Sequence, residues 1–448
     1  MTDRSASIGL SLRFVLTGVL SLVAGTILLM AYPDILATYH YNQRVIAVTH
    51  LFVLGFIGSI VMGALYQMVP VALETTLYSA RLGRWQYLCH AIGFVGLVWM
   101  FWRWNMAEVG HFASLFALGV GLFVYNLVRT LQTIPQWNVI AVTVASALAW
   151  FALTVLAGLY LAASKYWSFS PFHPIAAMHA HAHLGGVGVF LLLIVGISYK
   201  LIPMFVLGEI QSRRRAAWSI ILLNAGLAGL SVALLLDSGW KLAFAFVTIS
   251  GLAIYGVELR AILKHRKRRS LDWGILHFLS AIGGLLPLSV LAVVLCWPSL
   301  PVTEFTTQLE NVYGLLALLG VITFAILGML YKIVPFLVWY HCYSPHIGRA
   351  PVPSLAEMYS ARLQAVSFGF CLTGLLALAA ATATGHAAAV RWTVAIFAVG
   401  IACFTLNLGL ILSHFWRSKS ILWKHTAKSQ PLIKSMPSSA PSSIPSLG

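Results

Sequence analysis

The chain carries very little charge for its length. Asp, Glu, Lys and Arg together make up 9% of its 448 residues, whereas 60% of the residues are hydrophobic and the mean hydropathy is +0.89. A soluble domain carries about 25% charged residues. This shortage excludes an ordinary soluble globular protein and indicates a membrane protein.

Cysteine is also scarce, and its spacing excludes several kinds of site. None of the five cysteines forms a CxxC or CxxCH pattern, so the sequence predicts no disulfide framework, no zinc knuckle and no covalently attached c-type heme. Residues 1–8 are too short and too polar for a signal peptide, and we expect the first apolar run to be an uncleaved helix.

Long apolar runs dominate the rest of the chain. About twelve of them approach the ~20 residues that cross a bilayer as a helix. Lipid offers backbone groups no partner outside their own segment, so each run is expected to be helical. The expected spans are 9–31, 47–71, 84–102, 110–133, 137–162, 175–205, 216–236, 239–263, 273–297, 311–340, 361–382 and 389–415. The predicted fold class is all-α: a polytopic membrane protein of about twelve transmembrane helices.

The net charge of +17 has a positional explanation. If the N-terminus is cytoplasmic, nearly all Lys and Arg fall on the inner side, as the positive-inside rule requires. The exceptions are Arg44, Arg103, Lys165, Lys241 and Arg391. We therefore expect a multi-pass protein of the bacterial cytoplasmic membrane with both termini cytoplasmic. Membrane lipid is the expected partner of the basic run at 264–270, and nucleic acid is not expected.

One octapeptide pattern, Gly-x-x-Tyr-x-x-x-Pro, occurs three times, as GALYQMVP, GISYKLIP and GMLYKIVP. The copies start at residues 63, 196 and 328, and four expected helices separate each copy from the next. This predicts three parallel repeats of four helices within a transmembrane domain at 1–415. The repeat units cover about 9–133, 137–263 and 273–415, and the basic, Ser/Pro-rich tail at 416–448 is expected to be cytoplasmic and disordered.

The octapeptide itself has a packing explanation. We expect its Gly to let a neighbouring helix approach, its Tyr to lie near the inner interface, and its Pro to end the helix.

Histidines occur at matching places twenty residues before two of the octapeptide prolines. These are His50 and His183, and the third copy has Leu315 there. A histidine inside a membrane helix is costly and usually faces a bundle interior or a cavity. The matched pair therefore favours a ligand role near the outer ends of these helices.

The second unit holds further histidines in FHPIAAMHAHAHLGG. His179 and His183 share a helical face, whereas His181 is rotated by about 200° from His183 and faces another neighbour. The H-x-H pair could thus serve two centres. A polar, His-rich outer mouth without a metal remains an alternative for His173 and His179.

A helix that reads H-x-H and ends in G-x-x-Y-x-x-x-P resembles the tenth helix of heme–copper oxidase catalytic subunits (subunit I). The cbb-type branch is the most similar in this motif. The family has twelve helices in three arcs of four. In it, a helix-2 histidine and the second histidine of the pair hold a low-spin heme, and the first histidine binds a high-spin heme, which implies a cofactor role for His181 as well. His50 matches the first position, but the pair stands on the sixth helix as His181 and His183, and Tyr313 and Leu315 replace it on the tenth. The resemblance implies a heme, of unknown type, between His50 and His183, in a different arc from the family's own.

The copper ligands of that family are not recognisable. Its copper is held by one histidine of helix 6 and two of helix 7, and the seventh span here contains no histidine. Copper is therefore possible but has no motif in its support. His181, with His179 or His111, could form a second metal centre. His90 and His277 lie toward the inner side and are expected to be structural, and Glu258 is expected to make a local polar contact.

These patterns leave three functions open. The first is electron transfer or redox chemistry on oxygen or nitric oxide, with other redox subunits or a cytochrome or quinol donor as partners. The second is a metal-handling or small-solute transporter that uses the outer histidines. The third is a degenerate, non-catalytic subunit. No catalytic residue is assigned.

Overall fold

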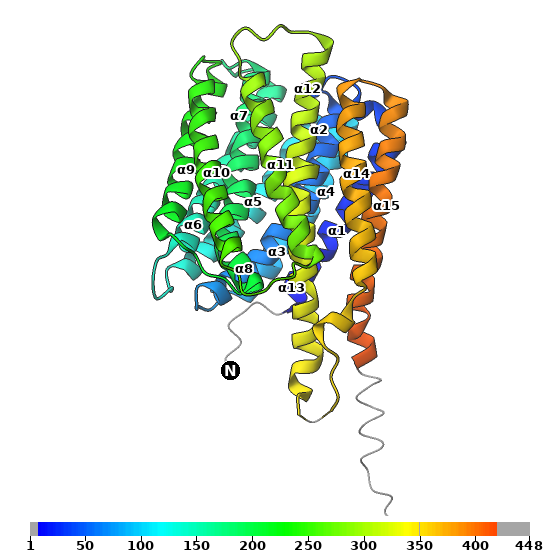
Figure 1. The fold of residues 1–448 in the computed structure, drawn as a ribbon. Helices are drawn as coiled ribbons and strands as arrows, with labels where there is room; N and C mark the ends of the chain where they lie inside the picture. Colours follow the sequence, from blue (N-terminus) through cyan, green and yellow to red (C-terminus); the bar gives the residue numbers. More distant parts are fainter. Residues whose placement is uncertain (1–7, 349, 419–448) are drawn as a thin grey trace, which may run out of the picture.

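The computed structural model describes residues 8–348 and 350–418, and these form a bundle of long helices that run between two ends (Figure 1). Most of the predicted tail at 416–448 lies outside the described residues. Nine spans are single helices: α1 (Ile8–Ala31), α4 (Ala80–Arg103), α5 (Met106–Leu131), α6 (Val139–Trp167), α9 (Arg213–Leu235), α10 (Lys241–Lys264), α11 (Trp273–Leu295), α14 (Ala361–Ala383) and α15 (Ala387–Leu412).

The three spans that end in the octapeptide are composite. Each has a wide π-helical stretch in its middle, in which backbone hydrogen bonds reach five residues back instead of four. They are α2 (Gln43–His50), η2 (Leu51–Gly58) and α3 (Ser59–Ala72); α7 (Pro174–His183), η3 (Leu184–Leu191) and α8 (Leu192–Val206); and α12 (Glu304–Leu315), η4 (Leu316–Ile322) and α13 (Thr323–Tyr343). Each π-helical stretch starts directly after His50, His183 or Leu315.

Eleven helices in the described part of the chain are long and apolar enough to cross a membrane. This agrees with a polytopic all-α membrane protein. The twelfth expected span is α4, which has 24 residues and packs along α5. Arg81, Arg84, Gln86 and His90 lower its apolar character, which accounts for its absence from the eleven.

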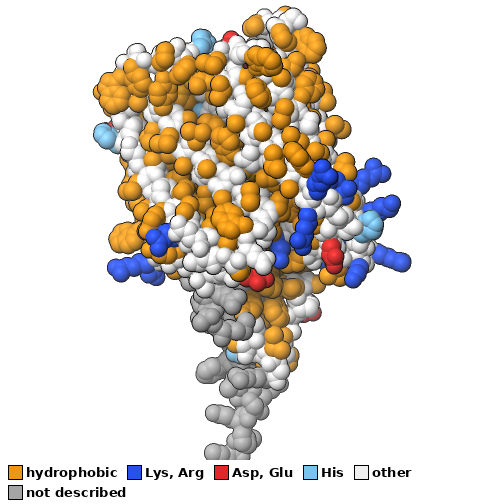
Figure 2. Space-filling model, turned by 90° about the vertical axis from the view of Figure 1, so that its left-hand side faces the viewer, with side chains coloured by type: hydrophobic (Ala, Val, Ile, Leu, Met, Phe, Trp, Pro, Cys, Tyr) orange, Lys and Arg blue, Asp and Glu red, His pale blue; other side chains and the backbone are white. Residues whose placement is uncertain are grey.

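The two ends of the bundle differ in chemistry. The terminal end is where α1 begins and α15 ends, and the histidine end is where α2, α7 and α12 begin (Figure 1). Figure 2 shows Lys and Arg side chains gathered toward the terminal end, with an apolar surface above them. The predicted asymmetry of charge along the bundle is therefore present on this face of the folded chain.

The glycine of each octapeptide packs as predicted. A Cβ atom at Gly63 would lie 2.6 Å from Phe14 of α1, and one at Gly196 would lie 2.2 Å from Thr143 of α6. At Gly328 it would lie 2.5 Å from the carbonyl oxygen of Gly274 of α11. Each composite span thus presses closely on the helix before it.

The prediction for the octapeptide proline was wrong, and the tyrosine packs between helices. The tyrosines Tyr66, Tyr199 and Tyr331 are buried in the core. The prolines Pro70, Pro203 and Pro335 lie inside helices, because α3, α8 and α13 all continue past them. A proline removes one backbone donor, but neighbouring helices in a bundle can stabilise the helix beyond it.

At the terminal end of each third of the bundle, that is, of each repeat unit of four helices, a polar side chain of one helix bonds to the backbone at the start of a neighbouring helix. We call this contact the polar lock. Asn126 of α5 bonds to the backbone of Ser79, and Asn407 of α15 bonds to that of Ser360. Each of these serines caps α4 or α14. The same relationship therefore recurs in units that are far apart in sequence.

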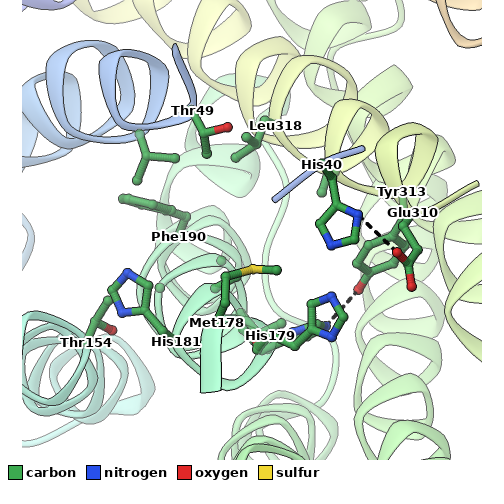
Figure 3. A pocket seen from close by; sticks show the side chains of 18 of the residues that line it. His40, Thr49, Thr154, Met178, His179, His181, Phe190, Glu310, Tyr313 and Leu318 are labelled. Atoms are coloured by element: carbon green, nitrogen blue, oxygen red, sulfur yellow. Dashed lines mark hydrogen bonds and ion pairs between the residues drawn. The ribbon is translucent and has the colours of Figure 1, made fainter. Parts of the chain in front are cut away.

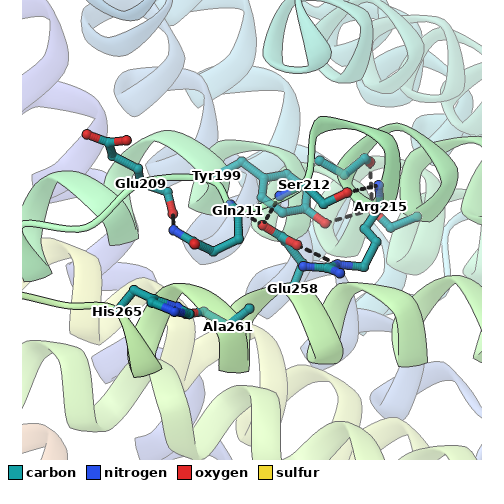
Figure 4. A network of polar contacts seen from close by, with 10 residues as sticks. Tyr199, Glu209, Gln211, Ser212, Arg215, Glu258, Ala261 and His265 are labelled. Carbon is teal, nitrogen blue, oxygen red and sulfur yellow. Dashed lines mark hydrogen bonds and ion pairs between the residues drawn. The ribbon is translucent and has the colours of Figure 1, made fainter.

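The middle third uses a charged version of this lock, drawn in Figure 4. The buried Glu258 of α10 accepts hydrogen bonds from the backbone N–H of Gln211 (2.6 Å) and of Ser212 (2.9 Å), which caps α9. Its other oxygen lies 2.7 Å from Nε of Arg215. Glu258 makes a polar contact as expected, but its partners lie on and before α9, more than 40 residues away in sequence, instead of beside it on α10.

Candidate functional site

A cavity of about 710 Å³ opens among the helices at the histidine end. Its walls are mostly apolar, and no residue of α14 or α15 lines it. Six histidines from four segments face it, and they are His40, His50, His173, His179, His181 and His183. The cavity therefore gathers nearly all the site residues that the sequence predicted.

His50 and His181 form the first group in the cavity. Their ring centroids are 6.5 Å apart, and their ring planes differ by 16°. His50 ends α2 and His181 lies on α7, so the contact joins the first and second thirds of the bundle. Apolar residues of α4, α5 and α6, among them Phe101 and Phe116, line the cavity with this pair.

Local contacts hold both rings in place. Nδ1 of His50 donates to the carbonyl oxygen of Ile46 at 2.7 Å, which leaves Nε2 with a free lone pair. The His181 ring lies next to Thr154 (Figure 3) and against Gly158 of α6. A Cβ atom at Gly158 would be 3.1 Å from Cε1 of His181, so the missing side chain makes room for the ring.

His183 forms a different pair, and this corrects the expected one. Its Nδ1 donates to the carbonyl oxygen of His179 at 2.8 Å, so its Nε2 accepts from the hydroxyl of Tyr313 at 3.2 Å. The two rings are 5.9 Å apart at the centroids. The structure thus pairs His50 with His181 and not with His183. His181 and His183 are two positions apart on one helix, so their side chains point in directions that differ by about 200°.

The two pairs follow one rule of register. The residue twenty before the octapeptide proline faces the residue twenty-two before the proline of the next unit: His50 faces His181, and His183 faces Tyr313. In the third unit the corresponding residues are Leu315 and Val48, which are both buried and apolar. Two of the three helix interfaces therefore carry polar pairs.

A third group lies near the mouth of the cavity and contains His40, His179 and Glu310. One possible ligand atom from each residue lies within 4.8 Å of the others. The loop before α2 provides His40, whereas α7 and α12 provide His179 and Glu310 (Figure 3). Sequence reasoning missed His40, because it stands outside every apolar span.

The start of the tenth span also differs from the prediction. It begins at Glu304, where Thr303 and Thr306 form a capping box, and not near residue 311. Glu310 is therefore inside the helix instead of at its start, which lets its carboxylate reach His40. The first turns of α12 are polar, so hydrophobicity alone does not predict that the helix starts this early.

The structure does not bring His111 to the cavity. Its side chain is 78% exposed and lies 3.4 Å from Glu108 on the same face of α5. His90 and His277 are buried away from the cavity, and their partners are the hydroxyl of Ser59 (2.8 Å) and the carbonyl of Trp273 (2.7 Å). The structural role predicted for those two residues agrees with these contacts.

The centroid spacing of His50 and His181 leaves room for one metal ion between the two rings. Two metal–nitrogen bonds of ~2 Å and the two ring radii place such centroids about 6 Å apart. The observed 6.5 Å agrees with that spacing. The cavity volume also lies within the range of about 300–1,000 Å³ usual for cofactor sites, which are mostly apolar with few polar groups.

Among solved structures, the fold is similar to that of a chain in the cryo-EM structure of a heme-copper terminal oxidase dimer. The TM-score is 0.63 at 12% sequence identity, over 89% of this chain and 84% of that chain. No family model and no curated protein matches the sequence. The likeness shows the fold, which is that of a polytopic all-α membrane protein.

Proposed function

We propose that this chain is a heme-binding membrane redox protein in which His50 and His181 are the two axial ligands of a low-spin heme. The observation that supports it most is the facing of two imidazoles across an apolar cavity at 6.5 Å, in a fold similar to that of a heme-copper terminal oxidase. The heme type stays open. The octapeptide motif supports a relation to the cbb-type branch.

The side chains around the pair suit this role. The carbonyl of Ile46 fixes the tautomer and the orientation of His50, as the second contact of a metal-binding histidine usually does. Gly158 leaves room for the ring of His181. The apolar walls exclude water, which affects the redox potential of a bound cofactor. A heme with two histidine ligands supplies reversible one-electron transfer.

His183 and Tyr313 line the other part of the same cavity. Residues of α9, α10 and α11 surround them, and the seventh span offers no histidine for a copper site. The hydroxyl of Tyr313 donates a hydrogen bond to Nε2 of His183, so this nitrogen is already occupied. We therefore assign electron transfer as the function. Redox chemistry on a diatomic gas would need a second metal centre in addition to the heme.

The test is a spectrum of the protein purified in mild detergent, with a pyridine hemochrome assay for heme content. Wild type should give a sharp α band on reduction. His50→Ala and His181→Ala should each abolish that band. His183→Ala is the matched control on the same helix, and it should keep the band.

Two results would reject the assignment. A colourless protein that takes up no heme would favour the metal-handling alternative. Loss of the band in His183→Ala together with its retention in His181→Ala would return the ligand role to His183.

We further propose that the terminal end faces the cytoplasm of a bacterial cell and that a cytochrome or quinol reduces the protein at the histidine end. The gathering of Lys and Arg at the terminal end supports this orientation. Reporter fusions after residue 418 should be active only with a cytoplasmic reporter. Rapid mixing of oxidised protein with a quinol or with reduced cytochrome would identify the donor.

A further inference from the structure

The group of His40, His179 and Glu310 has no role in the proposed heme site, yet its chemistry is that of a metal-binding site. Two imidazoles and one carboxylate converge from three segments of the chain, and one ligand atom of each lies within 4.8 Å of the others. We propose that these three residues bind one divalent transition-metal ion, separate from the heme.

The contacts of His40 point to a missing partner. Its Nδ1 lies 3.0 Å from Oε2 of Glu310, and its side chain is only 12% exposed. Both ring nitrogens are buried and have no hydrogen-bond partner among the described residues. The contact with Glu310 is an ion pair that leaves Nε2 unsatisfied, whereas a metal ion can satisfy a buried imidazole nitrogen.

The ring of His179 lies beside that of His40. Their centroids are 5.5 Å apart, and their planes differ by 19° (Figure 3). No hydrogen bond to the imidazole of His179 is present within the described residues, although its backbone carbonyl accepts from His183. Both imidazoles are therefore available to the same ion.

The backbone around the site is held in position. Asn311 of α12 donates to the carbonyl oxygen of Thr38 at 2.7 Å and to Oε1 of Gln308 at 2.9 Å. The first bond fixes the loop that carries His40 against the helix that carries Glu310, and the second orients the Asn311 side chain within α12. The ligands are thus positioned by contacts that do not depend on a metal.

The ligand types select a class of ion. Two histidine nitrogens and one carboxylate oxygen suit Zn²⁺, Cu²⁺ or Fe²⁺, whereas Mg²⁺ and Ca²⁺ prefer oxygen ligands alone. Three protein ligands also leave a coordination position open toward the cavity. Because His40, His179 and Glu310 come from different thirds of the bundle, a bound ion would link these units at the histidine end.

The experiment uses the full chain in detergent after treatment with EDTA. The protein is mixed with Zn²⁺, dialysed, and assayed for zinc and iron per chain by elemental analysis. Wild type should retain about one equivalent of zinc more than either His40→Ala or His179→Ala. Glu310→Gln should weaken zinc binding by about tenfold or more. Zinc should also raise the unfolding temperature of wild type and not that of the histidine variants.

Two matched controls limit the interpretation. His173→Ala removes another histidine at the start of α7, and Glu304→Gln removes an exposed carboxylate from α12. Both should retain the wild-type zinc content. With Cu²⁺ in place of zinc, electron paramagnetic resonance of wild type should show coupling to two imidazole nitrogens.

The proposal is overturned if wild type retains no zinc, or if His40→Ala and His179→Ala retain as much as wild type. A variant that fails to fold is replaced by His40→Asn, whose zinc content is judged in the same way. The heme band reports on His50 and His181, so failure of the heme assignment and failure of the zinc site produce different results.

Discussion

The rings of His50 and His181 face each other at the histidine end, with centroids 6.5 Å apart and planes that differ by 16°. They lie on helices of different repeat units; a hydrogen bond to Ile46 orients His50, and the ring of His181 packs against Gly158. The same register places His183 against Tyr313 in the next interface. Equivalent positions in the repeat units thus carry an imidazole pair at one interface and an imidazole–phenol pair at another.

Gly158→Ala should disturb the histidine ligand without removing it. The new Cβ would lie 3.1 Å from Cε1 of His181, so the ring must move by a few tenths of an ångström. We expect heme affinity to fall by about tenfold, with a shifted or broadened α band. Heme titration measures both. Gly121→Ala in α5 is the control, because nothing lies within 4 Å of its Cβ. An unchanged spectrum in Gly158→Ala would contradict the assigned ring position.

Tyr313→Phe should affect the second pair only. It removes the hydroxyl that lies 3.2 Å from Nε2 of His183 and leaves the ring in place. The heme spectrum should remain that of wild type, while the free energy of unfolding should fall by about 1–3 kcal/mol, because a buried acceptor loses its donor. Reduced spectra and denaturant unfolding in detergent check the two parts. A lost α band would show that Tyr313 contributes to the heme site.

Gly196→Ala should destabilise the bundle through its packing. A Cβ atom there would lie 2.2 Å from Cγ2 of Thr143, which a close-packed interface accommodates only by a shift of the helices. The expected cost is about 1–3 kcal/mol. Thermal unfolding compares it with Gly256→Ala in α10, which has open space around its Cβ and should be nearly neutral. Equal midpoints for the two variants would show that this contact tolerates a methyl group.

Glu258→Gln tests the charged lock of the middle third. Glutamine can still accept from the backbone N–H of Ser212, but the ion pair with Arg215 is lost. Because Arg215 is 41% exposed, water can solvate it, and we expect a loss of only about 1–2 kcal/mol. In a double-mutant cycle with Arg215→Gln, the two losses should not add. Additive losses would mean that the two side chains contribute independently.

Much of the fold could be predicted from hydrophobicity and spacing. Apolar runs define helices in lipid because the backbone has no other partners there, and the octapeptide revealed the close packing around Gly63, Gly196 and Gly328. The π-helical stretches after His50, His183 and Leu315 had no signal that we recognised. They depend on backbone hydrogen bonds, which side-chain periodicity does not report.

The candidate site was predicted only in part. His50, His179, His181 and His183 line the cavity as a histidine cluster suggested, whereas His111 faces away from it. His40 lies in a short loop where no periodicity applies. Its nearness to Glu310 depends on the extra turns at the start of α12 and on the contact between Asn311 and Thr38.

The sequence by itself determined that the chain enters a membrane as helices, that basic residues gather at one end, and that histidines stand twenty residues before two of the octapeptide prolines. These properties are local, since each follows from composition over a single span. Only the tertiary structure decided that His50 faces His181, that His183 bonds to Tyr313, and that His40 and His179 approach Glu310. Such partners lie far apart along the chain, and their meeting depends on the rotation of each helix about its axis, which packing against all its neighbours determines.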